Sequence, residues 1–448
     1  MRFLSIVLLN TMKKIQVALL LIVLVSFCKA QTYVSASVKF MQYLQQEKFD
    51  SCQQFMDTSL TNKISTDMMK EMWGNMSRFV GDYKGYSSIT STKTDTTVTT
   101  LVRCEFEKTK MDLALTYNQT HKLIGLFFKP AKSSTAHIEP SYCKNSNFYE
   151  SRLSVKKDNY TLPGILCIPN NIENPPVVIL LAGSGPNDKD ETIGPNKLLK
   201  DIATGLASQG IATFRYDKRT LTYGKELMEQ PDKVGINEEV IDDALSAIAL
   251  VKNNRLFKKS KITLIGHSLG AMSAPLIAKK SKDVKAIILL AGNARPLEDL
   301  LLEQYAYLFG LDSIDLTEKQ DLLKLEIQIK RVKNESLLKS TKPEDLPLGL
   351  HSYYWQSLNA CNQLEIAKKI KQPILIQQGE RDYQVTMTDF NLWKQALNSN
   401  SKNKFISYPT LNHLFMPGSG KSKPDEYEKP NNVDEQVIKD ISKWIKEL

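Results

Sequence analysis

The sequence predicts an α/β protein with a doubly wound, mostly parallel sheet and a helical insertion, preceded by a small α+β domain. Three patterns along the chain predict this fold class. From residue 148 onward, short continuous apolar runs alternate with amphipathic segments, as in strands covered on both faces by helices. Before residue 130 the apolar spacing is first helical and then has a period of two. Residues 294–365 interrupt the alternation with helical signals of their own.

Residues 1–30 have the layout of a secretory signal peptide. Two lysines precede an apolar stretch from Ile15 to Phe27, and a Cys-Lys-Ala sequence ends at Ala30. The stretch is shorter than the roughly 20 residues that a membrane span needs. We therefore expect cleavage after Ala30 and an exported chain, periplasmic or secreted, without a permanent membrane span. A retained N-terminal anchor is the alternative.

The composition is that of a globular protein, with 448 residues, 42% of them hydrophobic, and a formal net charge of +10. The basic residues are scattered among acidic ones and form no patch interleaved with aromatic residues, so nucleic acid is not expected as a partner. The cysteine spacing fits neither a zinc site nor a redox pair, and disulfides stay possible. We expect a buried thiol at Cys167, which lies among strand residues. The sequence leaves the oligomeric state open.

Residues 31–130 predict a small domain of helices followed by a curved antiparallel sheet. Its early apolar residues have helical spacing, and its later ones alternate with polar neighbours, with two strands joined at residues 118–121. Nothing in this domain indicates catalysis, and its function stays open. Residues 131–147 are polar, broken by proline and without periodicity, which predicts a linker. We expect His121, in the turn, and His137, in the linker, to be solvated.

Residues 148–448 predict the larger domain. Strands are expected at residues 176–183, 211–217, 261–266, 285–292, 373–379 and 404–409. In the insertion, 294–365, Thr317 and Gln320 form a capping pair ahead of a helical apolar pattern. Ligands of open α/β sheets bind beyond the carboxyl ends of the strands. We therefore interpret the insertion as a helical cap over that place.

A serine between two glycines follows the strand expected at 261–266. Gly266-His267-Ser268-Leu269-Gly270 fits the pattern G-x-S-x-G between a strand and a helix, where the serine sits in a strained bend. Larger residues at the two glycine positions would collide in that bend. The alternative is a structural serine that caps the helix. The context favours Ser268 as a nucleophile, with the N–H of Leu269 at the positive end of the helix.

A serine hydroxyl needs a base and an acid that orients the base. Among the five histidines only His351 and His413 follow Ser268, and His351 falls in the cap, so His413 is the expected base. Asp382 follows the strand expected at 373–379, and we expect it to be the acid. Glu380 in the same loop is the alternative acid, and a turn-stabilising role is the alternative for Asp382.

A glycine-rich segment after the first predicted parallel strand offers the second donor for an oxyanion. In residues 180–192 the backbone N–H of Ser184, with Gly183 possible, can approach a substrate closely. A tight turn without function is the alternative. The segment lacks the G-K-[ST] of a phosphate-binding loop. Tyr353, Tyr354 and Trp355 could line an apolar acyl site, although such residues more often form cap core.

These residues together resemble the α/β-hydrolase superfamily from residue 148 onward. "GSGPNDKDET", "RYDKRT", "GHSLG" and "GERDYQV" are similar to bacterial serine esterases near the serine aminopeptidases and dienelactone hydrolases, several of which carry a small domain ahead of the hydrolase. The resemblance implies Ser268, Asp382 and His413 as the triad and backbone donors at Ser184 and Leu269. One departure is Ala182, where many hydrolases have histidine. Arg215 and Asp217 are expected to brace the strand-end loop.

The resulting expectation is an exported serine carboxylesterase that hydrolyses short- to medium-chain acyl esters through an acyl-enzyme. Its expected partner is a small-molecule acyl ester, and no metal or organic cofactor is implied. A serine aminopeptidase or amidase of the same fold is one alternative, because the same triad cleaves amides. A non-catalytic cell-envelope binding protein is the other.

Overall fold

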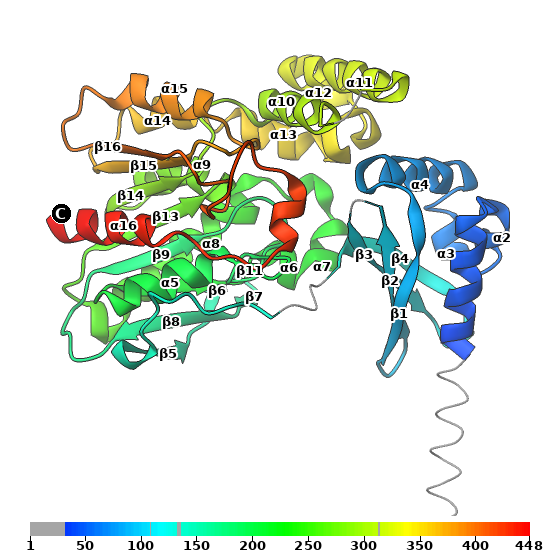
Figure 1. Cartoon of the computed structure of the whole chain (residues 1–448), viewed down its shortest axis with the longest axis horizontal. Helices are drawn as coiled ribbons and strands as arrows, with labels where there is room; N and C mark the ends of the chain where they lie inside the picture. Colours follow the sequence, from blue (N-terminus) through cyan, green and yellow to red (C-terminus); the bar gives the residue numbers. More distant parts are fainter. Residues whose placement is uncertain (1–31, 108, 132–135, 312–313) are drawn as a thin grey trace, which may run out of the picture. The chain divides into compact units, whose positions relative to one another are not determined.

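The computed structural model of the chain describes residues 32–107, 109–131, 136–311 and 314–448 (Figure 1). It divides into two compact units, with the boundary between Ser134 and Thr135. The predicted signal peptide lies outside the described residues. Within the described part of the chain, no helix has the length and hydrophobicity to cross a bilayer.

The first unit packs helices against one four-stranded antiparallel sheet, in the order β1-β2-β3-β4. A helix over residues 32–45 comes first. The further elements are α2 (Phe49–Gln53), α3 (Thr58–Thr61), α4 (Thr66–Val80), β1 (Tyr83–Lys93), β2 (Val98–Phe106), β3 (Lys110–Tyr117) and β4 (Leu123–Pro130). Strand β2 alternates buried and half-buried residues, as its period of two predicts. In the turn between β3 and β4, His121 is exposed, as expected.

The second unit is built on one eight-stranded sheet in the order β16-β15-β14-β13-β9-β12-β8-β5 (Figure 1). Its strands are β5 (Phe148–Arg152), β8 (Gly164–Pro169), β9 (Val177–Leu181), β12 (Ala212–Tyr216), β13 (Ile262–His267), β14 (Val284–Leu290), β15 (Ile374–Gly379) and β16 (Lys404–Tyr408). The six predicted strands are all present and mutually parallel. Strands β8 and β5 extend the sheet in antiparallel fashion. The predicted α/β fold class is thus confirmed.

Helices cover both faces of this sheet, and the central strands explain why. In β9 the alternate residues Val177, Ile179 and Leu181 enter one core, and Val178 and Leu180 enter the other. Every side chain of β9 is therefore buried, which produces the continuous apolar run in the sequence. The helices are α5 (Leu198–Ser208), α6 (Arg219–Thr222), α7 (Gly224–Met228), the π-helix η3 (Asn237–Ile241), α8 (Asp242–Asn253), α9 (Leu269–Lys280), α15 (Met387–Leu397) and α16 (Glu435–Glu447).

The segment between β14 and β15 is helical, as predicted for the cap (Figure 1). It contains α10 (Leu297–Phe309), α11 (Leu316–Lys333), α12 (Glu335–Ser340), α13 (Ser352–Asn359) and α14 (Gln363–Ala367). The capping pair of α11 was predicted two residues too late, at Thr317 and Gln320. The structure forms a capping box between Asp315 and Glu318 instead, because the Asp315 carboxylate accepts the N–H of Glu318.

Short elements connect these parts. Two small hairpins pair β6 (Val155–Lys157) with β7 (Tyr160–Leu162) and β10 (Thr192–Ile193) with β11 (Asn196–Lys197). The 3-10 helices are η1 (Asn145–Asn147), η2 (Pro231–Lys233), η4 (Arg255–Phe257), η5 (Pro343–Asp345), η6 (Pro347–Gly349) and η7 (Pro424–Glu428).

Residues of the predicted linker pack onto the second unit. The His137 side chain is 7% exposed and its Nε2 lies 2.7 Å from Oδ1 of Asp201, so the expectation of a solvated histidine was wrong. The Tyr142 hydroxyl donates to the carbonyl of Val433 at 2.8 Å. Local composition gave no sign of these partners, since both are distant in the sequence. The cysteines of the described segments are free thiols, and burial raises the pKa of the expected buried thiol, Cys167, to about 11.

Candidate active site

Ser268 occupies a sharp bend between β13 and α9. Its backbone has φ 51° and ψ −116°, a strained conformation for a residue with a side chain. The flanking glycines are required by close backbone approach. A Cβ on Gly266 would lie 2.3 Å from the carbonyl of Gly270, and one on Gly270 would lie 2.4 Å from the carbonyl oxygen of Leu181. The collisions expected from the sequence are therefore present, and the bend presents Ser268 ahead of the first turn of α9.

The first N–H groups of a helix have no partner within the helix. Leu269 begins α9, so its N–H is available beside Ser268 at the positive end of the helix dipole. A helix start in this position favours a negative charge next to the serine.

His413 and Asp382 are brought together by the loops that follow β16 and β15. The two atoms His413 Nδ1 and Asp382 Oδ2 lie 2.6 Å apart, and both side chains are buried. The other carboxylate oxygen, Oδ1, accepts the N–H groups of Gln384 at 2.7 Å and Val385 at 3.1 Å. Asp382 is therefore held as an acceptor that fixes the Nδ1–H tautomer of His413.

Glu380, the alternative acid, is exposed and accepts a hydrogen bond from the Ser407 hydroxyl at 2.7 Å. It has no contact with His413 in the described structure. His351 accepts the N–H of Tyr353 at the start of α13 and so has a structural role in the cap. Of the acids and histidines considered from the sequence, the structure pairs only Asp382 with His413.

The residue before Ser268, His267, contacts the loop that carries His413. The rings of His267 and His413 have centroids 4.7 Å apart, and Nε2 of His267 lies 3.1 Å from the carbonyl oxygen of His413. Among the described residues, the Ser268 hydroxyl itself has no hydrogen bond. The serine–histidine hydrogen bond of free enzymes is often long and tightens in the substrate complex.

The glycine-rich segment, residues 182–192, lies beside Ser268 and is here called the oxyanion loop. A Cβ on Gly183 would lie 3.3 Å from Cβ of Ser268 and 2.8 Å from Oε1 of Glu191, so only glycine allows this approach. The N–H of Gly183 donates to Glu191 at 2.9 Å. The suggestion that Gly183 is an oxyanion donor was therefore wrong, because its N–H is already engaged. The N–H of Ser184 has no partner within the described structure.

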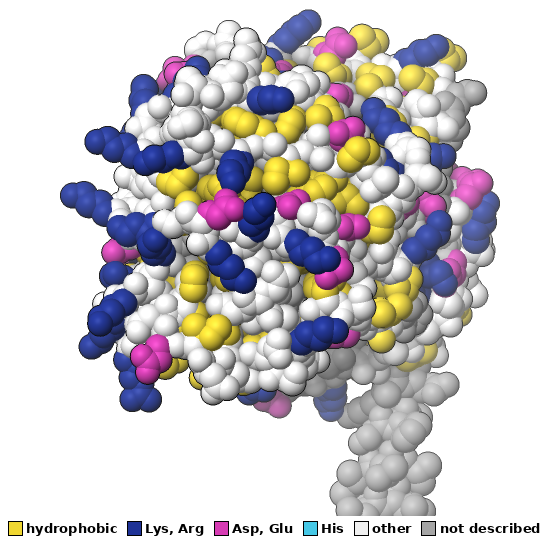
Figure 2. All heavy atoms as spheres, turned by 60° about the vertical axis from the view of Figure 1, so that its left-hand side comes forward, with side chains coloured by type: hydrophobic (Ala, Val, Ile, Leu, Met, Phe, Trp, Pro, Cys, Tyr) yellow, Lys and Arg dark blue, Asp and Glu magenta, His cyan; other side chains and the backbone are white. Residues whose placement is uncertain are grey.

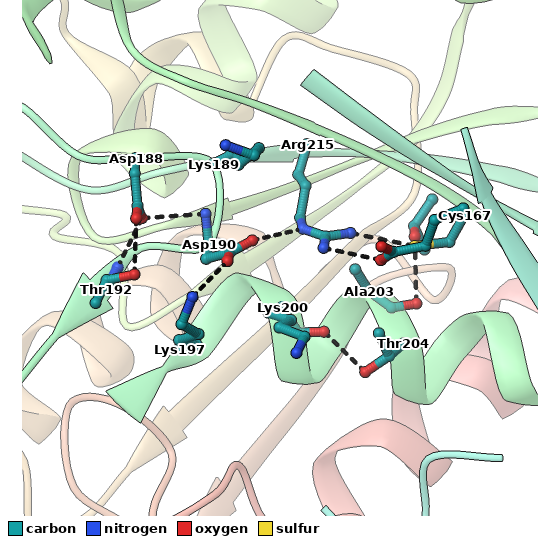
Figure 3. Close-up of polar contacts among 12 residues, drawn as sticks. Cys167, Asp188, Lys189, Asp190, Thr192, Lys197, Lys200, Ala203, Thr204 and Arg215 are labelled. Atoms are coloured by element: carbon teal, nitrogen blue, oxygen red, sulfur yellow. Dashed lines mark hydrogen bonds and ion pairs between the residues drawn. The ribbon is translucent and has the colours of Figure 1, made fainter. Parts of the chain in front are cut away.

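Partly buried ion pairs hold the oxyanion loop in place (Figure 3). Arg215 of β12 donates from Nε to Asp190 at 2.9 Å, and Lys197 binds the other oxygen of Asp190 at 2.8 Å. Asp217 accepts the backbone N–H of Lys189 at 2.7 Å. Arg215 and Asp217 thus brace this loop, as expected from the sequence.

Glu191 and His267 form a second acid–histidine pair that sequence reasoning missed. Nδ1 of His267 lies 2.8 Å from Oε1 of Glu191, the same oxygen that accepts the N–H of Gly183. Both ring nitrogens of His267 therefore face acceptors, Glu191 and the carbonyl of His413, so both must carry a proton. Burial by itself lowers the pKa of His267, but the Glu191 charge and the hydrogen bonds raise it overall. The bend at Ser268 is called the elbow below. The buried imidazolium of His267 connects this elbow with the loops that carry Glu191 and His413.

Replacing His267 by glutamine should lower stability in a pH-dependent way. The raised pKa means that the contribution of His267 is fully present below its unfolded pKa, about 6.5, and is lost as pH rises through the folded value. We expect a loss of about 3 kcal/mol at pH 6, because Glu191 loses its buried partner, and a smaller loss at pH 9. Urea unfolding of the wild type and of His267→Gln at pH 6, 7.5 and 9 measures the difference in their free energies of unfolding. A difference independent of pH would contradict the protonated pair.

The three aromatic residues suggested for substrate binding have other surroundings. Trp355 is 0% exposed and belongs to the hydrophobic core, so it cannot touch a substrate in this structure. Tyr354 is partly buried, and its hydroxyl donates to Oε2 of Glu239 at 2.6 Å. Tyr353 is 37% exposed. For Trp355 the prediction was wrong, because the cap helix α13 needs an apolar anchor on its inner face.

No group of three or more histidine, cysteine, aspartate or glutamate side chains that could hold a metal is found in the described parts of the chain. On the face shown in Figure 2, Lys and Arg side chains are interspersed with Asp and Glu side chains and apolar patches. That face therefore presents mixed charge.

Comparisons with known proteins find a relative that matches most of the chain. Residues 196–417, which include Ser268, Asp382 and His413, match a family described as serine aminopeptidase, S33. Residues 37–126 match a family described as a protein of unknown function. Esterase EstD of Thermotoga maritima is 34% identical over 409 residues, which cover 91% of this chain and 93% of that protein.

Two solved structures are similar to part of this chain. Est1E from Butyrivibrio proteoclasticus is 18% identical with a TM-score of 0.44, covering 66% of this chain and 98% of its own. Dienelactone hydrolase from Anabaena variabilis is 16% identical with a TM-score of 0.39, covering 67% and 98%.

The chain belongs to the α/β-hydrolase superfamily, a class of serine hydrolases. This follows from its fold, from the strained bend at Ser268 and from its 34% identity to a relative over 91% of the chain. Within that superfamily it is a carboxylic ester hydrolase of the serine esterase type, related to the Thermotoga esterase.

Proposed function

We propose that the chain is an exported serine carboxylesterase that hydrolyses short- to medium-chain acyl esters through Ser268, His413 and Asp382. The observation that carries the proposal is the 2.6 Å contact of Asp382 with His413, whose loop is bonded to the residue preceding Ser268. An imidazole oriented by a carboxylate and a serine in a strained bend are the groups that serine acyl transfer requires.

In the proposed reaction, Ser268 Oγ attacks the acyl carbon while its proton passes to Nε2 of His413. The negative charge that forms on the carbonyl oxygen is stabilised by the N–H groups of Ser184 and Leu269. His413 then gives the proton to the leaving alcohol, and an acyl ester on Ser268 remains. A water molecule, deprotonated by His413, attacks this ester, and the acid is released with Ser268 restored.

The test combines covalent labelling with substrate comparison. A fluorophosphonate probe should label the protein once, on the peptide that contains Ser268, and should abolish hydrolysis of p-nitrophenyl esters. Initial rates over p-nitrophenyl esters of increasing chain length should be highest for short and medium chains. Aminoacyl p-nitroanilides should be hydrolysed far more slowly. Faster cleavage of the anilides would favour the aminopeptidase alternative, and absence of labelling would favour a binding protein.

Export is proposed from the first 30 residues, with their paired lysines, apolar stretch and Cys-Lys-Ala ending. Expression of the full chain in a bacterial host, followed by N-terminal sequencing of the protein recovered outside the cytoplasm, should give a start at Gln31. Recovery of the uncut chain with the membrane fraction would favour a retained anchor.

A further inference from the structure

The peptide group between Gly183 and Ser184 is held by its carbonyl. The oxygen of Gly183 accepts hydrogen bonds from Nζ of Lys218 at 2.7 Å and from Nδ2 of Asn187 at 3.1 Å. Asn187 also binds the carbonyl of Ser184 at 2.8 Å. Both acceptor positions of the Gly183 oxygen are therefore filled from outside the place where an oxyanion would form.

This fixed carbonyl determines where the N–H of Ser184 points. Peptide bonds in the described residues are trans, so the N–H of Ser184 points away from the oxygen of Gly183. With the carbonyl turned to Lys218, the N–H is turned to the other side of the peptide. If the peptide rotated by half a turn, the oxyanion would meet a carbonyl oxygen and be repelled. The orientation of this one peptide thus decides whether the second donor exists.

Lys218 is itself held from the cap side. Its side chain is 5% exposed and forms an ion pair with Oε1 of Glu239 in η3 at 2.5 Å. The second oxygen of Glu239 accepts the hydroxyl of Tyr354 in the cap helix α13 at 2.6 Å. The backbone N–H of Lys218 also donates to the carbonyl of Asn187 at 3.0 Å. A continuous series of polar contacts therefore runs from Tyr354 through Glu239 and Lys218 to the oxyanion loop.

We propose that Lys218 is a positioning residue for the oxyanion hole, and that Glu239 and Tyr354 transmit the position of the cap to it. This inference rests on the proposed function, because it assigns the N–H of Ser184 to the oxyanion. Lys218 touches neither the nucleophile nor, in the proposed reaction, the substrate. It acts on the transition state only through the peptide that it orients.

The experiment compares Lys218→Met with the matched control Lys404→Met. Lys404 begins β16, at the end of the sheet opposite the loops that carry the candidate site, and pairs with Glu447 at 2.8 Å, so its replacement removes the same charge without touching the oxyanion loop. Active sites are counted by fluorophosphonate titration. Lys218→Met should lower kcat per active site for p-nitrophenyl esters by about 10- to 100-fold with KM nearly unchanged, because loss of a whole donor costs about 10²- to 10³-fold. Lys404→Met should retain the wild-type kcat.

A trifluoromethyl ketone gives the second readout, since its hemiketal on Ser268 places an oxyanion in the hole. Its inhibition constant should rise in Lys218→Met by the same factor as kcat falls. Unchanged kcat and inhibition constant, with only a lower Tm, would overturn the positioning role. So would an effect on KM alone.

Two further variants guard against misfolding. Lys218→Met leaves Glu239 buried without its cation, so Lys218→Met/Glu239→Gln removes both charges and keeps an acceptor for Tyr354. It should show the same loss of kcat. Tyr354→Phe removes one hydroxyl and should lower kcat by a smaller factor, about 2- to 10-fold, in the same direction. If Ser268→Ala remained active the proposed function would fail, whereas normal kcat in all Lys218 variants beside an inactive Ser268→Ala would refute only this inference.

Discussion

Ser268→Ala should lower kcat for p-nitrophenyl esters by about a million-fold. The variant keeps every backbone contact of the elbow, because the strained φ of 51° belongs to the residue and not to its hydroxyl. His413, Asp382 and the two N–H donors stay in place, yet no acyl bond to the chain can form. Rates with purified protein, corrected for spontaneous hydrolysis, measure the effect.

The control for this variant is Ser281→Ala, at the other end of α9. It removes a hydroxyl from the same helix and should retain the wild-type rate. Both variants should unfold within a few degrees of the wild type. Substantial turnover by Ser268→Ala would show that another group attacks the ester, and the assignment of the triad would have to be abandoned.

Asp382→Asn should lower kcat by about 10⁴-fold at neutral pH, with little change in KM. The contacts of Asp382 explain why an isosteric change is so costly. Oδ1 faces two backbone N–H groups, those of Gln384 and Val385, so the amide oxygen of asparagine must take that position. The amide nitrogen then faces Nδ1 of His413, which has to become an acceptor. The proton moves to Nε2, and His413 can no longer take the proton of Ser268.

Glu380→Gln is the matched control, because it makes the same chemical change two residues away. Glu380 is exposed and contacts Ser407, so the rate should stay at the wild-type value. The pH dependence distinguishes a misplaced His413 ring from a ring with its proton on the wrong nitrogen. If the tautomer is the cause, the rate of Asp382→Asn should recover partly at high pH, where hydroxide can assist the serine. Equal losses in the two variants would show that Asp382 is not the acid.

Much of the fold was predictable because it depends on local patterns. The strands predicted at 176–183 and 261–266 are β9 and β13, and their continuous apolar runs follow from burial on both faces. The elbow was predictable for the same reason: a strand, two glycines and a helix are consecutive in the chain, and collisions within five residues decide it. The start of α11 was misplaced because two capping pairs compete within a few residues.

Sequence reasoning missed Glu191 and Lys218 because their partners come from distant parts of the chain. The sequence around Glu191 does not show that it will bind His267. The sequence around Lys218 does not show that it will bind the carbonyl of Gly183, which lies 35 residues earlier in the chain. Both are charged residues in polar segments, which elsewhere would be solvated. The sequence offered one indication of these contacts: several charged residues follow each of the central strands β9 and β12. Burial of these charges is a property of the assembled sheet and cap.

By itself, then, the sequence determined the fold class and the candidates for nucleophile, base and acid, because few residues of these types follow one another in the expected order along the chain. Only the tertiary structure decided which peptide N–H groups are free, that Gly183 is engaged by Glu191, and that Trp355 is core. The physical reason is that a hydrogen-bond donor is free or engaged depending on acceptors that folding brings from distant segments. The order of residues along the chain does not show which acceptors these will be.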